Sequence, residues 1–148
     1  MKKINIFLDS SALIAGIISE TGAAHVLLQL GETEDVVLVI SEVVVNETSR
    51  SVARKSPENF DDVQMEIARA KIQIVPDPSD DEIQANLYLI SDPDDVPILL
   101  AAMKAKVDYL ATHDRKHFLD DPKVAERSGI KIGTPGDVIA WIRENLTS

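Results

Sequence analysis

Short apolar runs rich in β-branched residues alternate along this chain with longer segments of helical periodicity. Each apolar run has the length of a buried strand, and turn or helix-start residues follow it. Regular alternation of this kind predicts an α/β fold, in which a mostly parallel sheet is covered by helices on both faces. The predicted strands cover residues 4–8, 36–40, 72–75, 109–111 and 130–132.

The segments between these runs carry recognisable helix-start signals. Residues 79–82 form a capping box, in which a Ser and a Glu side chain each accept the other's backbone N–H. Several other starts place Pro in the first helical turn, where its missing N–H costs no hydrogen bond. The predicted starts are Ser10, Ser41 (ending near Lys55), Ser56-Pro57, Ser79, Asp92-Pro93 (opening 94–106), Asp121-Pro122 (closed by Gly129) and Thr134-Pro135.

Length and composition indicate a globular protein. The 148 residues predict one domain over 1–148, and the 45% hydrophobic and 27% charged residues are ordinary for such a domain. No apolar run approaches a membrane span, and Asn5 and Asp9 interrupt what would otherwise be the core of an export signal. We therefore expect a cytoplasmic protein with no membrane contact. With no cysteine, disulfides, thiolate metal sites and a cysteine nucleophile are excluded.

The formal net charge of -10 restricts the partners of this protein. A broadly acidic surface repels phosphate backbones, so simple electrostatic capture of nucleic acid is not expected. A phosphate substrate would have to be reached through bound metal or through locally clustered Lys and Arg residues.

Four carboxylates stand out from this general acidity by their positions. Asp9 follows the first strand and Asp114 follows the fourth. Asp95 lies in the first turn of its helix, and Glu47 lies about two turns into the helix after the second strand. Because the carboxyl ends of parallel strands share one edge of the sheet, these side chains are predicted to converge there.

Each of the four acids also has an ordinary structural explanation. Asp9 is a favoured helix N-cap, and Asp95 would complement its helix dipole. Asp114 suits a turn, and Glu47 suits a solvated helix face. The functional interpretation therefore depends on their joint occurrence beside strand ends.

Converging carboxylates require a cation. Two like charges ~4 Å apart repel by about 4 kcal/mol at an effective dielectric of 20, and they raise each other's pKa values. Oxygen-only ligation suits Mg²⁺ or Mn²⁺. Zinc is disfavoured because cysteine is absent and His25, His113 and His117 have no usual zinc spacing. A bound metal can activate water and neutralise charge at a scissile phosphate, which would let an acidic protein cut nucleic acid.

Four motifs in order make the sequence similar to the PIN-domain family, which includes the ribonuclease toxins of VapBC-type toxin–antitoxin pairs. Residues 9–14 resemble its opening motif, an Asp followed by small polar residues and an apolar helix. Residues 44–47 resemble the segment that carries its central helix glutamate. Residues 92–101 resemble the third acidic motif, where the register of the apolar run selects Asp95 over its neighbour. Residues 109–114 resemble the fourth, a strand ending in Thr or Ser, a small residue and Asp.

The resemblance implies a three-layer α/β/α fold and a Mg²⁺- or Mn²⁺-dependent nuclease that acts on RNA. Asp9 and Asp95 would be the principal metal ligands, and Glu47 and Asp114 would complete the site directly or through water. The resemblance also implies an antitoxin protein as a partner, and it makes a homodimer plausible. Trp141 on the last helix would suit such an interface, but its amphipathic pattern favours core packing. Two hydroxyl side chains are predicted to bind a ligand or the phosphate, namely Ser10 and Thr112.

Two residues depart from the family's pattern beside the fourth motif. His113 stands where the family often has glycine, and His117 stands where a second acid is frequent. A histidine at position 117 could touch phosphate, but we expect a surface or packing role, because functional side chains are rare.

Two other classes of protein compete with the nuclease. A catalytically inactive module with the same fold would bind RNA or protein without cleavage, which the net charge and the lack of an obvious basic groove favour. A receiver-type phosphoacceptor domain would want adjacent acids after the first strand, where Ser10 and Ser11 stand instead. Ser11 also argues against a phosphatase of the haloacid-dehalogenase class, which needs a second Asp at that position.

Overall fold

The computed structural model describes residues 3–146 and contains a five-stranded sheet in the order β3-β2-β1-β4-β5. All neighbouring strands run parallel, so the predicted mostly parallel sheet is fully parallel in these residues. Each strand begins and ends within one residue of its predicted range. The strands are β1 (Asn5–Leu8), β2 (Val37–Ser41), β3 (Gln73–Val75), β4 (Tyr109–Ala111) and β5 (Lys131–Gly133).

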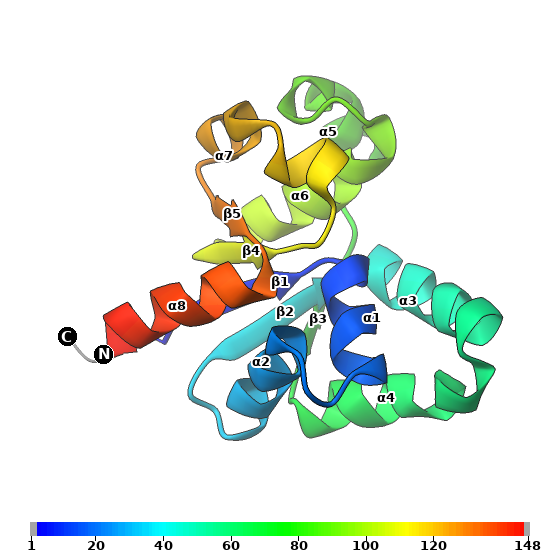
Figure 1. Cartoon of the computed structure of the whole chain (residues 1–148). Coiled ribbons are helices and arrows are strands. Elements are labelled where there is room, and N and C mark those ends of the chain that lie inside the picture. The colour runs from blue at the N-terminus through cyan, green and yellow to red at the C-terminus, as the bar shows by residue number, and fades with distance from the viewer. Residues whose placement is uncertain (1–2, 147–148) are drawn as a thin grey trace.

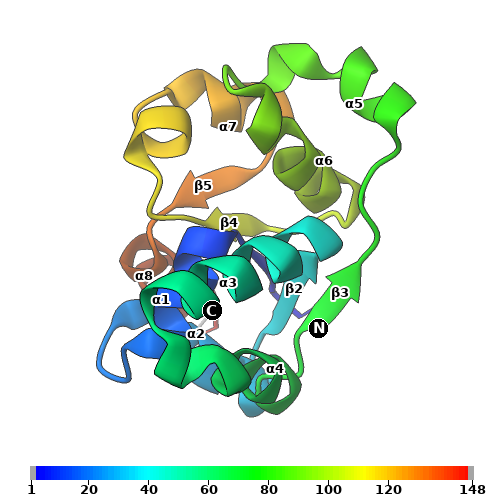
Figure 2. The ribbon, with the colours of Figure 1, turned by 90° about the vertical axis from the view of Figure 1, so that its right-hand side faces the viewer.

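Helices cover both faces of the sheet and complete the predicted three layers (Figure 1). One face carries α5, α6 and α7, and the other carries α1 to α4 together with α8 (Figure 2). The α-helices are α1 (Ser10–Ile18), α2 (Ala23–Glu32), α3 (Glu42–Lys55), α4 (Phe60–Arg69), α5 (Asp80–Ala85), α6 (Val96–Lys104), α7 (Pro122–Ser128) and α8 (Pro135–Leu146). Short turns are η1 (Pro57–Asn59), η2 (Leu87–Leu89) and η3 (Pro93–Asp95), which are 3₁₀-helical, and η4 (Arg115–Leu119), which is π-helical.

The helix predicted over residues 94–106 begins later than expected, because a second proline lies inside it. An α-helix starting at Asp94 would put Pro97 at the fourth helical position, where the first intrahelical N–H is required. The chain instead makes the 3₁₀ turn η3 and starts α6 at Val96, which places Pro97 in the first turn. This arrangement leaves Asp95 at the junction of the two elements.

The start of α3 near Ser41 is confirmed, but its cap is not the one that the sequence indicates. The Ser41 side chain makes no capping hydrogen bond. Asp77 supplies the cap from 34 positions along the chain, since its Oδ1 accepts from the N–H of Val43 at 3.0 Å. Two other predicted devices are confirmed, namely the capping box of Ser79 and Glu82 and the left-handed Gly129 (φ 73°) that ends α7.

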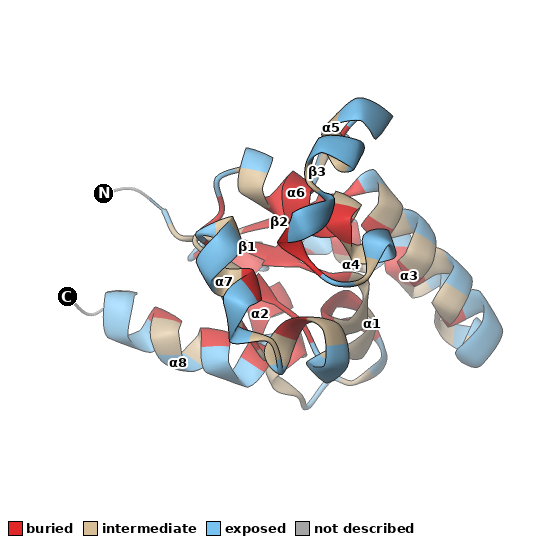
Figure 3. Cartoon of the chain, turned by 90° about the horizontal axis from the view of Figure 1, so that it is seen from above, coloured by how far each residue is buried: buried red, intermediate tan, exposed pale blue. Residues whose placement is uncertain are grey.

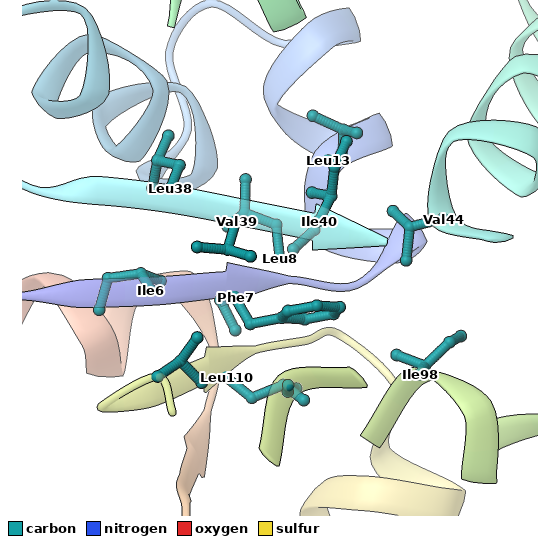
Figure 4. Close-up of a cluster of buried hydrophobic side chains, with 14 of the residues drawn as sticks. Ile6, Phe7, Leu8, Leu13, Leu38, Val39, Ile40, Val44, Ile98 and Leu110 are labelled. Atoms are coloured by element: carbon teal, nitrogen blue, oxygen red, sulfur yellow. The ribbon is translucent and has the colours of Figure 1, made fainter. Parts of the chain in front are cut away.

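Strand β1 occupies the centre of the sheet, between β2 and β4. Figure 3 shows buried residues concentrated on the strands and on the helix faces turned toward them. Figure 4 shows Ile6, Phe7 and Leu8 packed among the side chains of neighbouring elements, and each is at most 1% exposed. Because tightly packed interiors deform little, the carboxyl end of β1 is a rigid base for the residues that follow it.

Trp141 packs against the core from α8, so its predicted packing role is confirmed. Its ring lies 5.4 Å from that of Tyr109 on β4, with the planes inclined at 57°. The Lys131 Nζ lies 5.7 Å from the centre of the same ring. Lys131 belongs to β5, so these contacts connect α8 to β4 and β5, the two strands at one side of the sheet.

Within residues 3–146, no single helix has the length and hydropathy needed to cross a membrane. Helices α1 and α2 meet that criterion only as a pair, and the chain bends by 89° between them.

Candidate functional site

Asp9 is the first residue after β1, and its carboxylate caps α1 by accepting the N–H of Ala12 at 3.0 Å. The residue is 5% exposed. Burial raises the pKa of the Asp9 carboxyl, and hydrogen bonds from Thr112, Ser11 and Ala12 oppose this shift by stabilising the charged form. The predicted capping role and a site role are therefore compatible, because one carboxylate serves both the helix and the edge of the sheet.

Two hydroxyl groups hold the Asp9 carboxylate in place. Ser11 Oγ donates to Oδ1 at 2.7 Å, and Thr112 Oγ1 donates to Oδ2. The same hydroxyl oxygens accept backbone N–H groups from beyond β4, with Ser11 accepting from His113 and Thr112 from Asp114, each at 2.9 Å. This network joins the corner after β1 to the corner after β4.

Replacing Thr112 by valine should lower the free energy of unfolding by about 1–3 kcal/mol, because it leaves a buried carboxylate oxygen and a backbone N–H without partners. Thr112 is fully buried, so water cannot easily replace its hydroxyl. Urea denaturation of the variant measures the effect. Thr112→Ser is the matched control, since it keeps the hydroxyl and loses one methyl group, worth about 0.8 kcal/mol. Equal stability of the two variants would contradict this reading of the network.

Asp95 lies between η3 and α6, and its side chain is 17% exposed. Burial and the negative charges of Asp92 and Asp114 raise the pKa of its carboxyl to about 7, against the opposing effect of His117. Among the described residues, Oδ2 of Asp95 has no hydrogen-bond partner. A buried carboxylate without its full set of donors indicates a group suited to binding a cation.

Glu47 reaches the same region from α3. Burial raises the pKa of its carboxyl, the Ser10 hydroxyl opposes the shift by hydrogen bonding, and the charge of Asp9 adds to it. Its Oε1 is buried and has no partner in the part of the chain that the structure describes. Two acids of the region thus each have an oxygen available for a ligand.

Asp114 caps the π-helical turn η4, where its Oδ1 accepts the N–H of His117 at 3.1 Å. The turn directs the His117 ring into the acids. Its Nδ1 lies 3.2 Å from Asp114 Oδ2 and 3.4 Å from Asp95 Oδ2, and its Nε2 lies 3.6 Å from Asp92 Oδ2. The ring therefore faces three carboxylates.

The structure brings the four predicted acids into one electrostatic cluster. Asp9 raises the pKa of Glu47 and of Asp95 by charge repulsion, and Asp114 raises that of Asp9. The four acids therefore lie close enough for their charges to interact.

Three members of the site were not identified from the sequence. His117, for which a surface or packing role is expected, lies with its ring nitrogen atoms 3.2–3.6 Å from three carboxylates. Its three-residue spacing from Asp114 was the available signal. The sequence predicts Asp92 only as the start of a helix, and Ser11, not Ser10, is the serine that hydrogen-bonds Asp9.

Part of this cluster has the geometry of a metal site. Asp92, Asp95 and His117 each offer a ligand atom, and these atoms lie within 4.8 Å of one another. The donors are oxygens with one imidazole nitrogen, a set compatible with a divalent cation.

Solved structures with this fold support the architecture. The chain is similar to PAE2754 from Pyrobaculum aerophilum, with a TM-score of 0.62 at 15% identity over 95% of this chain and 90% of that one. It is also similar to VapBC2 from Rickettsia felis, solved with a DNA fragment from its promoter (TM-score 0.63, 18% identity, 88% and 98% covered). VapC20 from Mycobacterium tuberculosis, described as a sarcin-ricin loop cleaving toxin, matches with a TM-score of 0.50 at 20% identity (75% and 91% covered).

No curated protein sequence matches the chain significantly. The family model described as the PIN domain does match, over residues 5–116. That segment contains β1 to β4, all four predicted acids and the first two residues of η4. The chain belongs to the PIN-domain family.

Proposed function

We propose that this protein is a divalent-metal-dependent endoribonuclease of the PIN type. One observation carries the proposal, namely that Asp9 interacts electrostatically with Glu47, Asp95 and Asp114, although the four acids come from separate segments of the chain. In this proposal Asp9 and Asp95 are the principal ligands of Mg²⁺ or Mn²⁺. Glu47 and Asp114 complete the site directly or through water.

The residues fit such an ion. Buried carboxylate oxygens without hydrogen bonds, on Glu47 and Asp95, are the donors that a hard cation would satisfy. When bound, the ion would supply an activated water and neutralise charge on the scissile phosphate. Charge repulsion, which together with burial raises the pKa values of Asp9, Glu47 and Asp95, would be relieved at the same time.

The neighbouring hydroxyl groups have separate parts in this proposal. Thr112 is fully buried, and its hydroxyl already contacts Asp9 and Asp114, so we assign it to positioning Asp9 and no longer to substrate binding. Ser11 positions the other Asp9 oxygen. Ser10 is half-buried beside Glu47 and remains the hydroxyl proposed to contact the substrate.

The proposed substrate is RNA and the proposed biological role is that of a toxin. VapC20 is described as cleaving the sarcin-ricin loop, and the Rickettsia structure is a VapBC pair. By this analogy an antitoxin would restrain the present protein, and a homodimer is plausible. The net charge of -10 fits this proposal only if bound metal, and not a basic surface, meets the substrate phosphate.

The test is Mn²⁺-dependent cleavage of single-stranded and structured RNA by the purified protein, with EDTA as the metal-free reference. Asp9→Asn should lower cleavage by roughly 10²–10³-fold, the size expected when one preorganised stabilising group is lost. Asp81→Asn removes the same charge from an exposed position on α5 and should leave the rate unchanged. Binding of RNA without turnover in any divalent metal would instead identify an inactive binding module.

A further inference from the structure

His117 is a histidine whose ring is surrounded by three carboxylates. The π-helical turn η4 carries it, and such turns are rare and are frequently found at functional sites. Its side chain is 28% exposed, so the ring is accessible from solvent while its nitrogen atoms face inward. Both ring nitrogen atoms have carboxylate neighbours. Nδ1 lies near Asp95 and Asp114, whereas Nε2 lies near Asp92.

On the Nδ1 side, the ring nitrogen lies close to one oxygen of each of two carboxylates. Nδ1 lies 3.2 Å from Asp114 Oδ2 and 3.4 Å from Asp95 Oδ2. Neighbouring ligands of an octahedral ion with bonds of about 2.1 Å are roughly 3 Å apart. Nδ1 and the Asp95 oxygen can therefore share a divalent ion with small side-chain movements.

On the Nε2 side, Asp92 is placed to orient the ring. Its Oδ1 is committed to the N–H of Asp94 at 2.9 Å, which fixes the carboxylate at the start of η3. Its Oδ2 lies 3.6 Å from Nε2 of His117. A histidine that binds a metal through one nitrogen commonly donates its other N–H to a carboxylate in this way.

We propose that His117 is a nitrogen ligand, through Nδ1, of the same ion that Asp95 binds, and that Asp92 orients it through Nε2. This inference rests on the proposed metal site and names a ligand that the sequence did not suggest. A nitrogen ligand at this position would affect which divalent ion the site prefers. Imidazole suits transition ions such as Fe²⁺, Ni²⁺ and Zn²⁺, whereas Mg²⁺ is bound by oxygen. A nitrogen ligand should therefore shift the selectivity of this site away from Mg²⁺ and toward transition ions, Mn²⁺ among them.

A different role for the same geometry is that of an internal counter-ion. An imidazolium beside three carboxylates would offset their charge in the metal-free protein and move away when an ion binds. In that case His117 would compete with the metal, and its removal would strengthen binding of Mg²⁺ and Mn²⁺ alike.

Pulsed electron paramagnetic resonance of the full chain loaded with Mn²⁺ distinguishes the two roles. Direct ligation predicts ¹⁴N hyperfine coupling from a coordinated imidazole in the wild-type protein and its loss in His117→Asp. Calorimetry should show the ratio of Mn²⁺ to Mg²⁺ affinity falling by roughly tenfold in His117→Asp, and Mn²⁺ affinity falling by about tenfold in Asp92→Asn. His113→Asp, which removes a nearby exposed histidine, should keep the coupling.

The possible failures are separable. If Mn²⁺ binds and supports cleavage but the wild-type spectrum lacks ¹⁴N coupling, the role of His117 as a ligand is wrong and the proposed nuclease stands. If no divalent ion binds the wild-type protein, both proposals fail. The wild-type spectrum needs no variant, so poor folding of His117→Asp would not prevent the test.

Discussion

Replacing Asp95 by asparagine should abolish metal-dependent cleavage while making the metal-free protein more stable at pH 8. The loss of cleavage follows from its proposed role as a principal ligand, and roughly 10²–10³-fold is expected. The gain in stability follows from the carboxyl's environment. Burial and three neighbouring acids raise its pKa to about 7, so its ionised form is disfavoured in the folded protein.

The size of this stabilisation can be bounded from the same shift. The ordinary pKa of this carboxyl is 3.8 and its folded value is about 7, so ionisation at pH 8 costs the folded state roughly 2–4 kcal/mol. Asparagine has nearly the same shape and no charge. Urea denaturation at pH 8 in EDTA measures the gain, and Asp81→Asn is the control because that carboxylate is exposed. An Asp95→Asn protein that is less stable than the wild type under these conditions would contradict the assignment.

The fold was predictable from the sequence because its signals are local. Buried parallel strands such as β1 and β2 are continuous apolar runs, and capping residues mark the helices between them. The boundary of α6 was missed because it depends on Pro97 acting against a start signal four positions earlier. The cap of α3 was missed because Asp77 reaches it only through the folded structure.

The site residues divide in the same way, into those with a local signal in the sequence and those brought together only by folding. Asp9 and Asp114 were predictable because they directly follow strands, and parallel strands bring their ends to one edge. His117 and Asp92 lie 25 positions apart, and they meet only because η3 and η4 place them on facing turns. Nothing in the spacing of histidines and acids along the chain indicates a turn of π-helical geometry.

The choice between Ser10 and Ser11 is a finer example. Both follow Asp9, and both are half-buried at the start of α1. The direction of each side chain depends on helical phase, which places Ser11 against Asp9 and Ser10 toward Glu47. A motif can therefore identify the segment without identifying which hydroxyl contacts which acid.

The second large effect is a fall in the stability of the metal-free protein as pH rises from about 5 to 8. Between the unfolded pKa of 3.8 and the folded value of about 7, Asp95 holds a proton in the folded state that it has lost in the unfolded state. The unfolded protein therefore binds fewer protons in this range, and the free energy of unfolding decreases with pH. The raised pKa values of Asp9 and Glu47 act in the same direction.

Saturating Mn²⁺ should remove most of this fall, because the ion binds the ionised carboxylates and its affinity rises as they lose their protons. At 100 times its dissociation constant a ligand adds about 2.7 kcal/mol to the free energy of unfolding, comparable to the loss that deprotonation causes. Thermal or urea unfolding at pH 5, 6.5 and 8, with EDTA and with Mn²⁺, measures both effects. Asp95→Asn should flatten the metal-free profile, and Asp81→Asn should reproduce the wild-type one. A free energy of unfolding that rises with pH in EDTA would mean that these acids are solvated or paired. The electrostatic argument for a metal ion bound between them would then fail.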